Sequence, residues 1–125
     1  MQLLLDTTIF LWWLKDDAQL SKKARTLIKN ADIVYISSIS IWEAAIKIQL
    51  GKLTADINQL VNAIPEQGFV AFPLLATQAS IISSLPPIHR DPFDRMLIAQ
   101  AISEPLRLLT SDKVLKNYSE LVEIV

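Results

Sequence analysis

The stretch QLLLDTTIFLWWL, residues 2–14, joins two apolar segments through a single carboxylate. Residues 2–5 form a short apolar run that is typical of a buried parallel strand, and Asp6 stands at its carboxyl end. Residues 7–14 continue as an apolar helix. A lone carboxylate buried between two such segments costs several kcal/mol or takes up a proton. Asp6 therefore indicates a functional site more strongly than a packing role.

The rest of the chain alternates strands and helices in the same way. Further strands are expected at residues 33–37, 69–72, 107–109 and 121–124. Further helices are expected at residues 22–30, 41–50, 56–66, 76–84, 92–103 and 112–117. This order predicts an α/β fold, a three-layer α/β/α sandwich around a mostly parallel central sheet. With 125 residues and no visible linker or repeat, the chain is expected to form one domain over residues 1–125.

The composition limits the kinds of site that the chain can build. It contains no cysteine and one histidine, which excludes disulfides, zinc–thiolate sites and cysteine nucleophiles. Any metal ion must then be held mainly by oxygen, which favours Mg²⁺ or Mn²⁺. The net charge of −1 and the pI of about 5.7 argue against a DNA-binding protein that depends on bulk positive charge.

The hydropathy of the chain predicts a partner protein. Hydrophobic residues make up 51% of the sequence and the mean hydropathy is +0.33, which is high for a small soluble protein. We expect a homodimer or a second protein to cover part of the surface. The apolar N-terminal run is too short to span a bilayer and lacks the basic start of a signal peptide. The chain is therefore expected to be cytoplasmic, with no membrane contact.

Four carboxylates follow strands or begin helices at one edge of the expected sheet. Asp6 follows the first strand and Asp112 follows the strand at residues 107–109, whereas Glu43 and Asp94 lie in the first turns of two helices. Parallel sheets bind ligands beyond the carboxyl ends of their strands, so we expect these side chains to converge. Converging carboxylates repel one another. A divalent cation relieves this repulsion and can also activate water and bind a phosphate.

Taken singly, three of these acids also have a structural interpretation. Glu43 lies three residues after Ser40, which is expected to begin its helix, so the two could form a capping box. Glu43 could equally pair with Lys47 one helical turn later. Asp94 would favour the positive end of its helix, and Asp112 could cap the short helix that follows it. The four acids together are better evidence for a site than any one of them.

Four local motifs carry these acids in order. They are LLDT at residues 4–7, ISSISIWE at residues 36–43, HRDPFDRMLIAQA at residues 89–101 and LLTSD at residues 108–112. In these motifs the chain resembles the PIN-domain ribonucleases of the VapC-like class, which are the toxins of bacterial and archaeal toxin–antitoxin pairs. The resemblance covers essentially the whole chain, and residues 89–101 are its most specific part.

The resemblance implies an endoribonuclease that hydrolyses single-stranded RNA with Mg²⁺ or Mn²⁺. It assigns the metal and the catalysis to four carboxylates: Asp6, Glu43, Asp94 and Asp112. It also implies a cognate antitoxin as partner, in keeping with a homodimer that binds a second protein. One departure stands at Thr8, where relatives of this subtype often carry histidine or asparagine.

Three basic residues near the acids are candidates for binding the RNA phosphates. Lys47, Arg90 and Arg95 each lie close in sequence to one of the four acids. They could equally act as counter-ions that keep the acidic cluster folded. The sequence leaves both interpretations open.

Three further residues near the site are assigned supporting roles. The hydroxyl of Thr110 could orient Asp6 or Asp112, or it could satisfy the end of a strand. Asp91 is expected to be the N-cap of the helix that begins at residue 92. His89 follows a proline-rich turn, and we expect it to be structural, because a single histidine makes no catalytic triad.

Two other classes of protein remain as alternatives. The first is a catalytically silent PIN-like protein that acts as a binding or assembly partner, with its acids serving as helix caps. A buried Asp6 argues against it, because a protein without catalysis has no need for that carboxylate. The second is a receiver-type phosphoryl-transfer domain, which would need a second acid beside Asp6 where this chain has Thr7 and Thr8.

Overall fold

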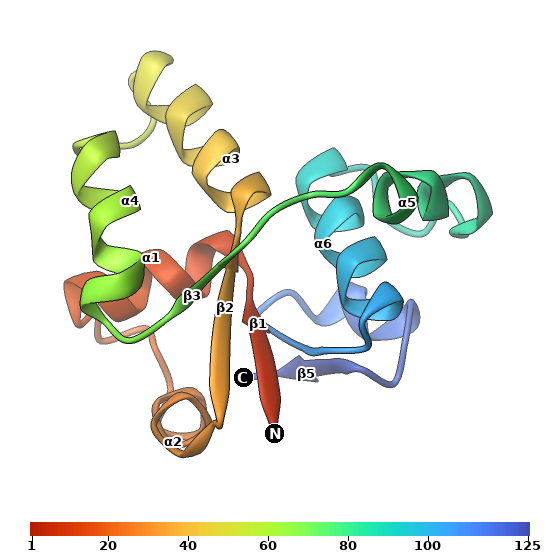
Figure 1. Cartoon of the computed structure of the whole chain (residues 1–125), viewed down its shortest axis with the longest axis horizontal. Helices are drawn as coiled ribbons and strands as arrows, with labels where there is room; N and C mark the ends of the chain where they lie inside the picture. Colours follow the sequence, from red (N-terminus) through yellow and green to blue (C-terminus); the bar gives the residue numbers. More distant parts are fainter.

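The computed structural model describes residues 1–125 and places a five-stranded sheet at the centre of the molecule (Figure 1). All neighbouring strands are parallel, in the order β3-β2-β1-β4-β5. The strands are β1 (Gln2–Leu5), β2 (Ile33–Ser37), β3 (Val70–Phe72), β4 (Arg107–Thr110) and β5 (Val122–Ile124). The predicted α/β fold with a parallel central sheet is confirmed.

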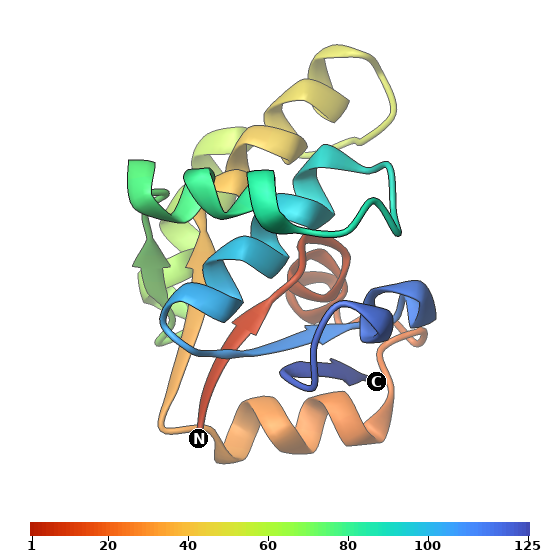
Figure 2. The ribbon, with the colours of Figure 1, turned by 90° about the vertical axis from the view of Figure 1, so that its right-hand side faces the viewer.

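Helices cover both faces of this sheet (Figures 1 and 2). The α-helices are α1 (Thr7–Lys15), α2 (Lys22–Asn30), α3 (Ser38–Gln49), α4 (Ile57–Glu66), α5 (Ala76–Ala79) and α6 (Pro92–Ser103). Two 3₁₀ helices complete the chain, η1 (Ser80–Ser84) and η2 (Lys113–Asn117). Side chains of α1, α2 and α4 bury one face, and those of α6 and η2 bury the other. This arrangement confirms the predicted three layers.

Strand β1 is central and contributes to the core on both sides. Leu3 and Leu5 pack with α1 and α2, whereas Leu4 packs with α6, and all three side chains are fully buried. The alternation follows from the two-residue period of a strand, and each buried leucine contributes about 1.5–3 kcal/mol. The neighbours β2 and β4 hold β1 in fixed register, so the residue that follows β1 has a fixed position too.

Helix α3 begins earlier than the sequence suggests. Its N-cap is Ser37, the last residue of β2, whose hydroxyl accepts a hydrogen bond from the Ile39 amide at 3.0 Å. Ser40 therefore lies inside the helix, and its hydroxyl accepts a hydrogen bond from the Thr7 hydroxyl at 2.9 Å. The predicted helix start at Ser40 and the Ser40–Glu43 capping box are wrong, because the strand passes into the helix without a loop. Glu43 lies in the second turn.

A buried amide network connects α6 to β2 and α5. The Ser37 hydroxyl donates to Gln100 Oε1 at 2.5 Å, and Gln100 Nε2 donates to Gln78 Oε1 at 3.2 Å. Gln78 Nε2 in turn donates to Glu104 at 3.3 Å. Buried polar groups are costly unless they are paired, so breaking any of these hydrogen bonds would be unfavourable. It fixes the position of α6 relative to α3, the two helices that carry Asp94 and Glu43.

No helix in the structure combines the length and the apolar character that crossing a membrane requires.

Candidate active site

The candidate site lies at the carboxyl edge of the sheet, where β1, β2 and β4 end and four helices begin. Asp6 lies between β1 and α1, Glu43 is on α3, Asp94 is on α6 and Asp112 lies between β4 and η2. The positive ends of the helix dipoles are therefore directed toward one region, which favours negative groups there.

Asp6 is buried at the centre of this edge and is only 5% exposed. Its Oδ1 accepts the Ile9 amide at 2.8 Å, which caps α1. The pKa of Asp6 is raised to about 6, mainly by burial and to a smaller extent by the negative charges of Glu43 and Asp112, while the hydrogen bonds from Thr110 and Ile9 lower it. Glu43 and Asp112 are thus close enough to Asp6 for their charges to repel that of its carboxylate.

Asp94 faces the same centre from the first turn of α6. The pKa of Asp94 is raised to about 7, mainly by burial and then by the charges of Asp91, Asp6 and Glu43, while His89 lowers it. The carboxylate makes no bond to a helix end, because the N-cap of α6 is Asp91, whose Oδ1 accepts the amides of Phe93 and Asp94 at 2.8 and 3.2 Å. The predicted capping role of Asp91 is confirmed. Asp94 has no local structural role of this kind.

Glu43 is paired with Lys47 on the same helix. Lys47 Nζ lies 2.5 Å from Glu43 Oε2, and the Glu43 side chain is only 7% exposed. The hydrogen bond with Glu43 is the main cause that raises the pKa of Lys47, and the charges of Asp91 and Asp94 add to it. The structure therefore places Lys47 as a counter-ion of the acidic cluster, which was one of its two predicted roles.

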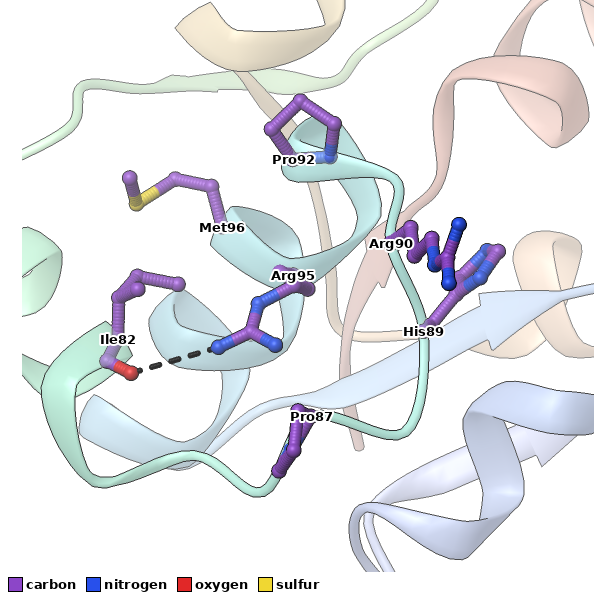
Figure 3. A pocket seen from close by; sticks show the side chains of 7 residues that line it. All are labelled: Ile82, Pro87, His89, Arg90, Pro92, Arg95 and Met96. Atoms are coloured by element: carbon purple, nitrogen blue, oxygen red, sulfur yellow. Dashed lines mark hydrogen bonds between the residues drawn. The ribbon is translucent and has the colours of Figure 1, made fainter.

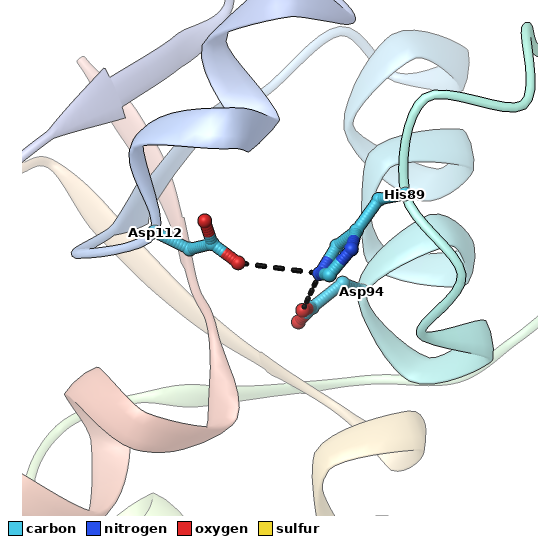
Figure 4. A group of neighbouring side chains, drawn as sticks. All are labelled: His89, Asp94 and Asp112. Carbon is cyan, nitrogen blue, oxygen red and sulfur yellow. Dashed lines mark hydrogen bonds and ion pairs between the residues drawn. The ribbon is translucent and has the colours of Figure 1, made fainter.

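His89 links Asp94 and Asp112, as Figure 4 shows. Its Nε2 lies 3.2 Å from Asp94 Oδ2 and 3.2 Å from Asp112 Oδ2. The three residues offer ligand atoms within 4.8 Å of one another. The backbone amide of His89 donates to the Tyr118 hydroxyl at 2.7 Å, which holds the loop in place. The expectation of a merely structural His89 missed this contact. The only available signal was its position five residues before Asp94.

Asp112 and Thr110 complete the edge. Asp112 Oδ1 accepts the Val114 amide at 3.1 Å and caps η2, so Oδ2 is the atom directed at His89. The buried Thr110 hydroxyl accepts the Asp112 amide at 3.1 Å and also bonds to Asp6. Thr110 thus touches two of the four acids, at the place where the sequence suggested an orienting hydroxyl.

Arg90 and Arg95 lie to one side of the acids. Both line a cavity next to the acidic centre, together with His89 (Figure 3). Arg95 Nη2 donates to the Ile82 carbonyl at 3.4 Å. Neither arginine forms an ion pair with any of the four acids. In this they differ from Lys47, which pairs with Glu43.

The chemistry of this donor set fits a hard divalent cation. It combines four carboxylates from four elements, and one lysine lies close enough to pair with them. Burial, and after it the neighbouring carboxylates, raises the pKa of Asp6 and of Asp94, so ionising these groups is costly unless a cation binds beside them. Oxygen ligands of this kind are those that Mg²⁺ and Mn²⁺ prefer, with the His89 nitrogen as an additional donor.

Comparison with known proteins identifies the family. The family model of the PIN domain matches residues 3–121. The chain belongs to the PIN-domain family. This PIN domain is 31% identical over 121 residues to Ribonuclease VapC22 of Mycobacterium tuberculosis, a match that covers 92% of the chain and 90% of that relative. The resemblance drawn from the four motifs is confirmed.

Solved structures share the fold of this PIN domain at low sequence identity. VapBC2 from Rickettsia felis, solved with a DNA fragment from its promoter, matches with a TM-score of 0.74 and 20% identity, covering 100% of this chain and 99% of that one. A toxin–antitoxin complex from Klebsiella pneumoniae matches with a TM-score of 0.68 and 16% identity, covering 96% and 94%. FitAcB from Neisseria gonorrhoeae has a TM-score of 0.67 and 17% identity, covering 98% and 96%. These likenesses support the same three-layer architecture.

Proposed function

We propose that this PIN domain is a metal-dependent endoribonuclease that cleaves single-stranded RNA. The observation that carries the proposal is the convergence of four carboxylates at one sheet edge, in a chain 31% identical to a ribonuclease. The proposed metal ligands and catalytic residues are Asp6, Glu43, Asp94 and Asp112. The cofactor is Mg²⁺ or Mn²⁺, which when bound polarises water and offsets charge on the phosphate.

The residues around these ligands have defined tasks in this proposal. Thr110 keeps Asp6 and Asp112 in a fixed relation through its two hydrogen bonds. Lys47 balances the charge of Glu43 and so limits the repulsion in the cluster. Arg90 and Arg95 bind RNA phosphates, because guanidinium groups suit bidentate phosphate binding.

We also propose that the chain is the toxin of a toxin–antitoxin pair and acts in the cytoplasm as a single domain. The relative from Klebsiella pneumoniae is a toxin–antitoxin complex. Several large apolar side chains of this chain are exposed, among them Trp42, Val61 and Val70. A cognate antitoxin and a second copy of the chain would cover such surface.

Cleavage of single-stranded RNA by the purified protein tests this function. We expect cutting with Mg²⁺ or Mn²⁺ and none with EDTA. A Glu43→Gln variant, purified identically, keeps the shape of the side chain and removes its charge, so it reports any contaminating nuclease. If the wild type, the EDTA sample and the variant behave alike on several RNAs, the acids are structural and the protein is an assembly partner.

The position of His89 predicts a preference between the two metal ions. Imidazole nitrogen is a better ligand for Mn²⁺ than for Mg²⁺. We expect His89→Ala to weaken Mn²⁺ binding by about tenfold or more while changing Mg²⁺ binding much less. Calorimetric titration of wild type and variant with each ion measures this difference. An equal loss for both ions would mean that His89 acts only by holding Asp94 and Asp112.

A further inference from the structure

A pocket of about 570 Å³ opens beside the acidic centre, between η1, the loop before α6 and the first turns of α6 (Figure 3). Ligand pockets in proteins commonly have volumes of about 300–1,000 Å³. A water molecule occupies about 30 Å³ of liquid, so this space is far larger than an inorganic anion needs. The pocket can hold a group the size of a nucleotide.

The pocket contains two arginines without a carboxylate partner. The chain has four arginines, and the other two form ion pairs, Arg25 with Asp16 and Arg107 with Glu123. Arg90 and Arg95 form none. Arg95 is held by the Ile82 carbonyl, which leaves other guanidinium donors for a ligand. Two unpaired guanidinium groups next to an acidic centre favour an anionic ligand, and phosphate suits their geometry.

The remaining walls of the pocket are apolar. Ile82 and Met96 lie near each other on one side of Arg95 in Figure 3, and Pro87 and Pro92 also line the pocket. Flat or flexible apolar side chains provide surface against which a nucleobase can pack, and such packing does not depend on hydrogen bonds to particular bases. The pocket thus combines a phosphate-binding side and a base-packing side.

His89 forms the boundary between this pocket and the acidic centre. It lines the pocket, and its Nε2 lies 3.2 Å from both Asp94 and Asp112. A nucleotide in the pocket is therefore one side chain away from the proposed metal ligands. This position suits the nucleotide next to the phosphate that is cut.

We propose that this pocket binds one nucleotide of the RNA substrate, with its phosphate on Arg90 and Arg95 and its base against Ile82 and Met96. The location next to the cut rests on the proposed ribonuclease function. The binding of a nucleotide in the pocket does not depend on that function. The pocket accordingly contributes to which RNA sequences are cleaved.

The chain offers an internal probe for this binding, because it contains two methionines. Met96 lines the pocket, whereas Met1 is exposed at the amino end of β1, the end of the sheet away from the acids. In the full-length protein labelled with ¹³C-methyl methionine, we expect AMP, GMP, CMP and UMP to shift the Met96 signal and leave Met1 unchanged. Inorganic phosphate is expected to shift Met96 far less. The titrations are made in EDTA and repeated with Mg²⁺, so that binding through a metal is separated from binding in the pocket.

Two variants with the same chemical change sharpen this test. Arg95→Gln is expected to weaken nucleotide binding by about tenfold, the loss typical of one charged hydrogen bond. Arg107→Gln removes an arginine that is paired with Glu123 on β5, and we expect it to bind nucleotides as the wild type does. Equal effects of the two variants would show that general charge, and not the pocket, binds the nucleotide.

The result that overturns the proposal is a Met96 signal that none of the four nucleotides shifts at millimolar concentration. This outcome is distinct from failure of the ribonuclease function, since no cleavage is needed for the shift. Nucleotide binding at Met96 without RNA cleavage would support the nucleotide pocket and contradict the ribonuclease function. RNA cleavage without a shift of the Met96 signal would support the ribonuclease function and contradict the nucleotide pocket.

Discussion

Asp94→Asn is expected to reduce RNA cleavage by on the order of 10² to 10³-fold, the range seen when one preorganised charge-stabilising group is removed from an active site. Asp94 is the most informative of the four acids, because its carboxylate caps no helix and its side-chain partner is His89, itself a proposed metal donor. Asp6 and Asp112 each cap a helix, and Glu43 binds Lys47, so their replacement also changes local structure. A loss of activity in Asp94→Asn is therefore a loss of chemistry.

Initial rates of RNA cleavage with saturating Mg²⁺ or Mn²⁺ measure this effect. Asp91→Asn is the matched control, because Asp91 is the N-cap of the same helix and asparagine caps equally well. We expect the control to retain most of the wild-type rate. Comparable losses in Asp91→Asn and Asp94→Asn would mean that the charge of the whole helix start matters, and that Asp94 has no special role as a ligand.

The metal-free protein is expected to lose stability as the pH rises from about 4 to about 7. In the folded state the pKa of Asp6 is raised to about 6 and that of Asp94 to about 7, from the ordinary value of 3.8. Between these limits the folded chain binds more protons than the unfolded chain, so the free energy of unfolding decreases with pH. One unit of pKa corresponds to about 1.4 kcal/mol, and the expected decrease is a few kcal/mol.

Urea denaturation in EDTA at several pH values between 4 and 8 measures this decrease. In Asp94→Asn the curve should be flatter and the protein more stable at pH 7.5, because one buried charge is gone. Saturating Mg²⁺ should stabilise the wild type at pH 7.5, by about 2.7 kcal/mol at a hundred times its dissociation constant, and stabilise the variant less. Wild-type stability that is constant over this pH range in EDTA would contradict the electrostatic account of the cluster.

The strand-end rule is the part of the site that the sequence predicts well. Asp6 follows the run 2–5 and Asp112 follows the run 107–109, and both acids are where parallel strands end. These positions depend on local hydrophobic patterns, which a sequence displays directly. The convergence of the acids then follows from the parallel order of the strands.

Contacts between distant segments were harder to predict. His89 appears in the sequence as a loop histidine, and only the docking of α6 beside β4 brings it between Asp94 and Asp112. The start of α3 was misplaced because Ser37 and Ser40 are both plausible caps. In the structure Ser37 caps α3 and also forms a buried hydrogen bond with Gln100, a contact that spans 63 positions in the chain.

The three basic candidates also divide in a way that the sequence could not show. Lys47 lies one helical turn after Glu43, so the pair forms within α3. Arg90 and Arg95 flank Asp94 in sequence, yet they line the pocket and pair with none of the four acids. Which cation meets which acid depends on the direction of each side chain, and sequence spacing alone does not give that direction.

At Asp6 and Asp112, one carboxylate oxygen caps a helix and the other is free for a second contact. In each, Oδ1 accepts a backbone amide at the helix start, and in Asp112 the second oxygen is directed at the site. A ligand held in this way needs little reorganisation when a cation arrives, because the same bond that begins the helix sets the direction of the carboxylate. Lengthening either side chain to glutamate is expected to disturb a helix start as well as a proposed metal ligand. At Asp112 one side chain thus fixes both the start of a helix and the direction of a proposed metal ligand.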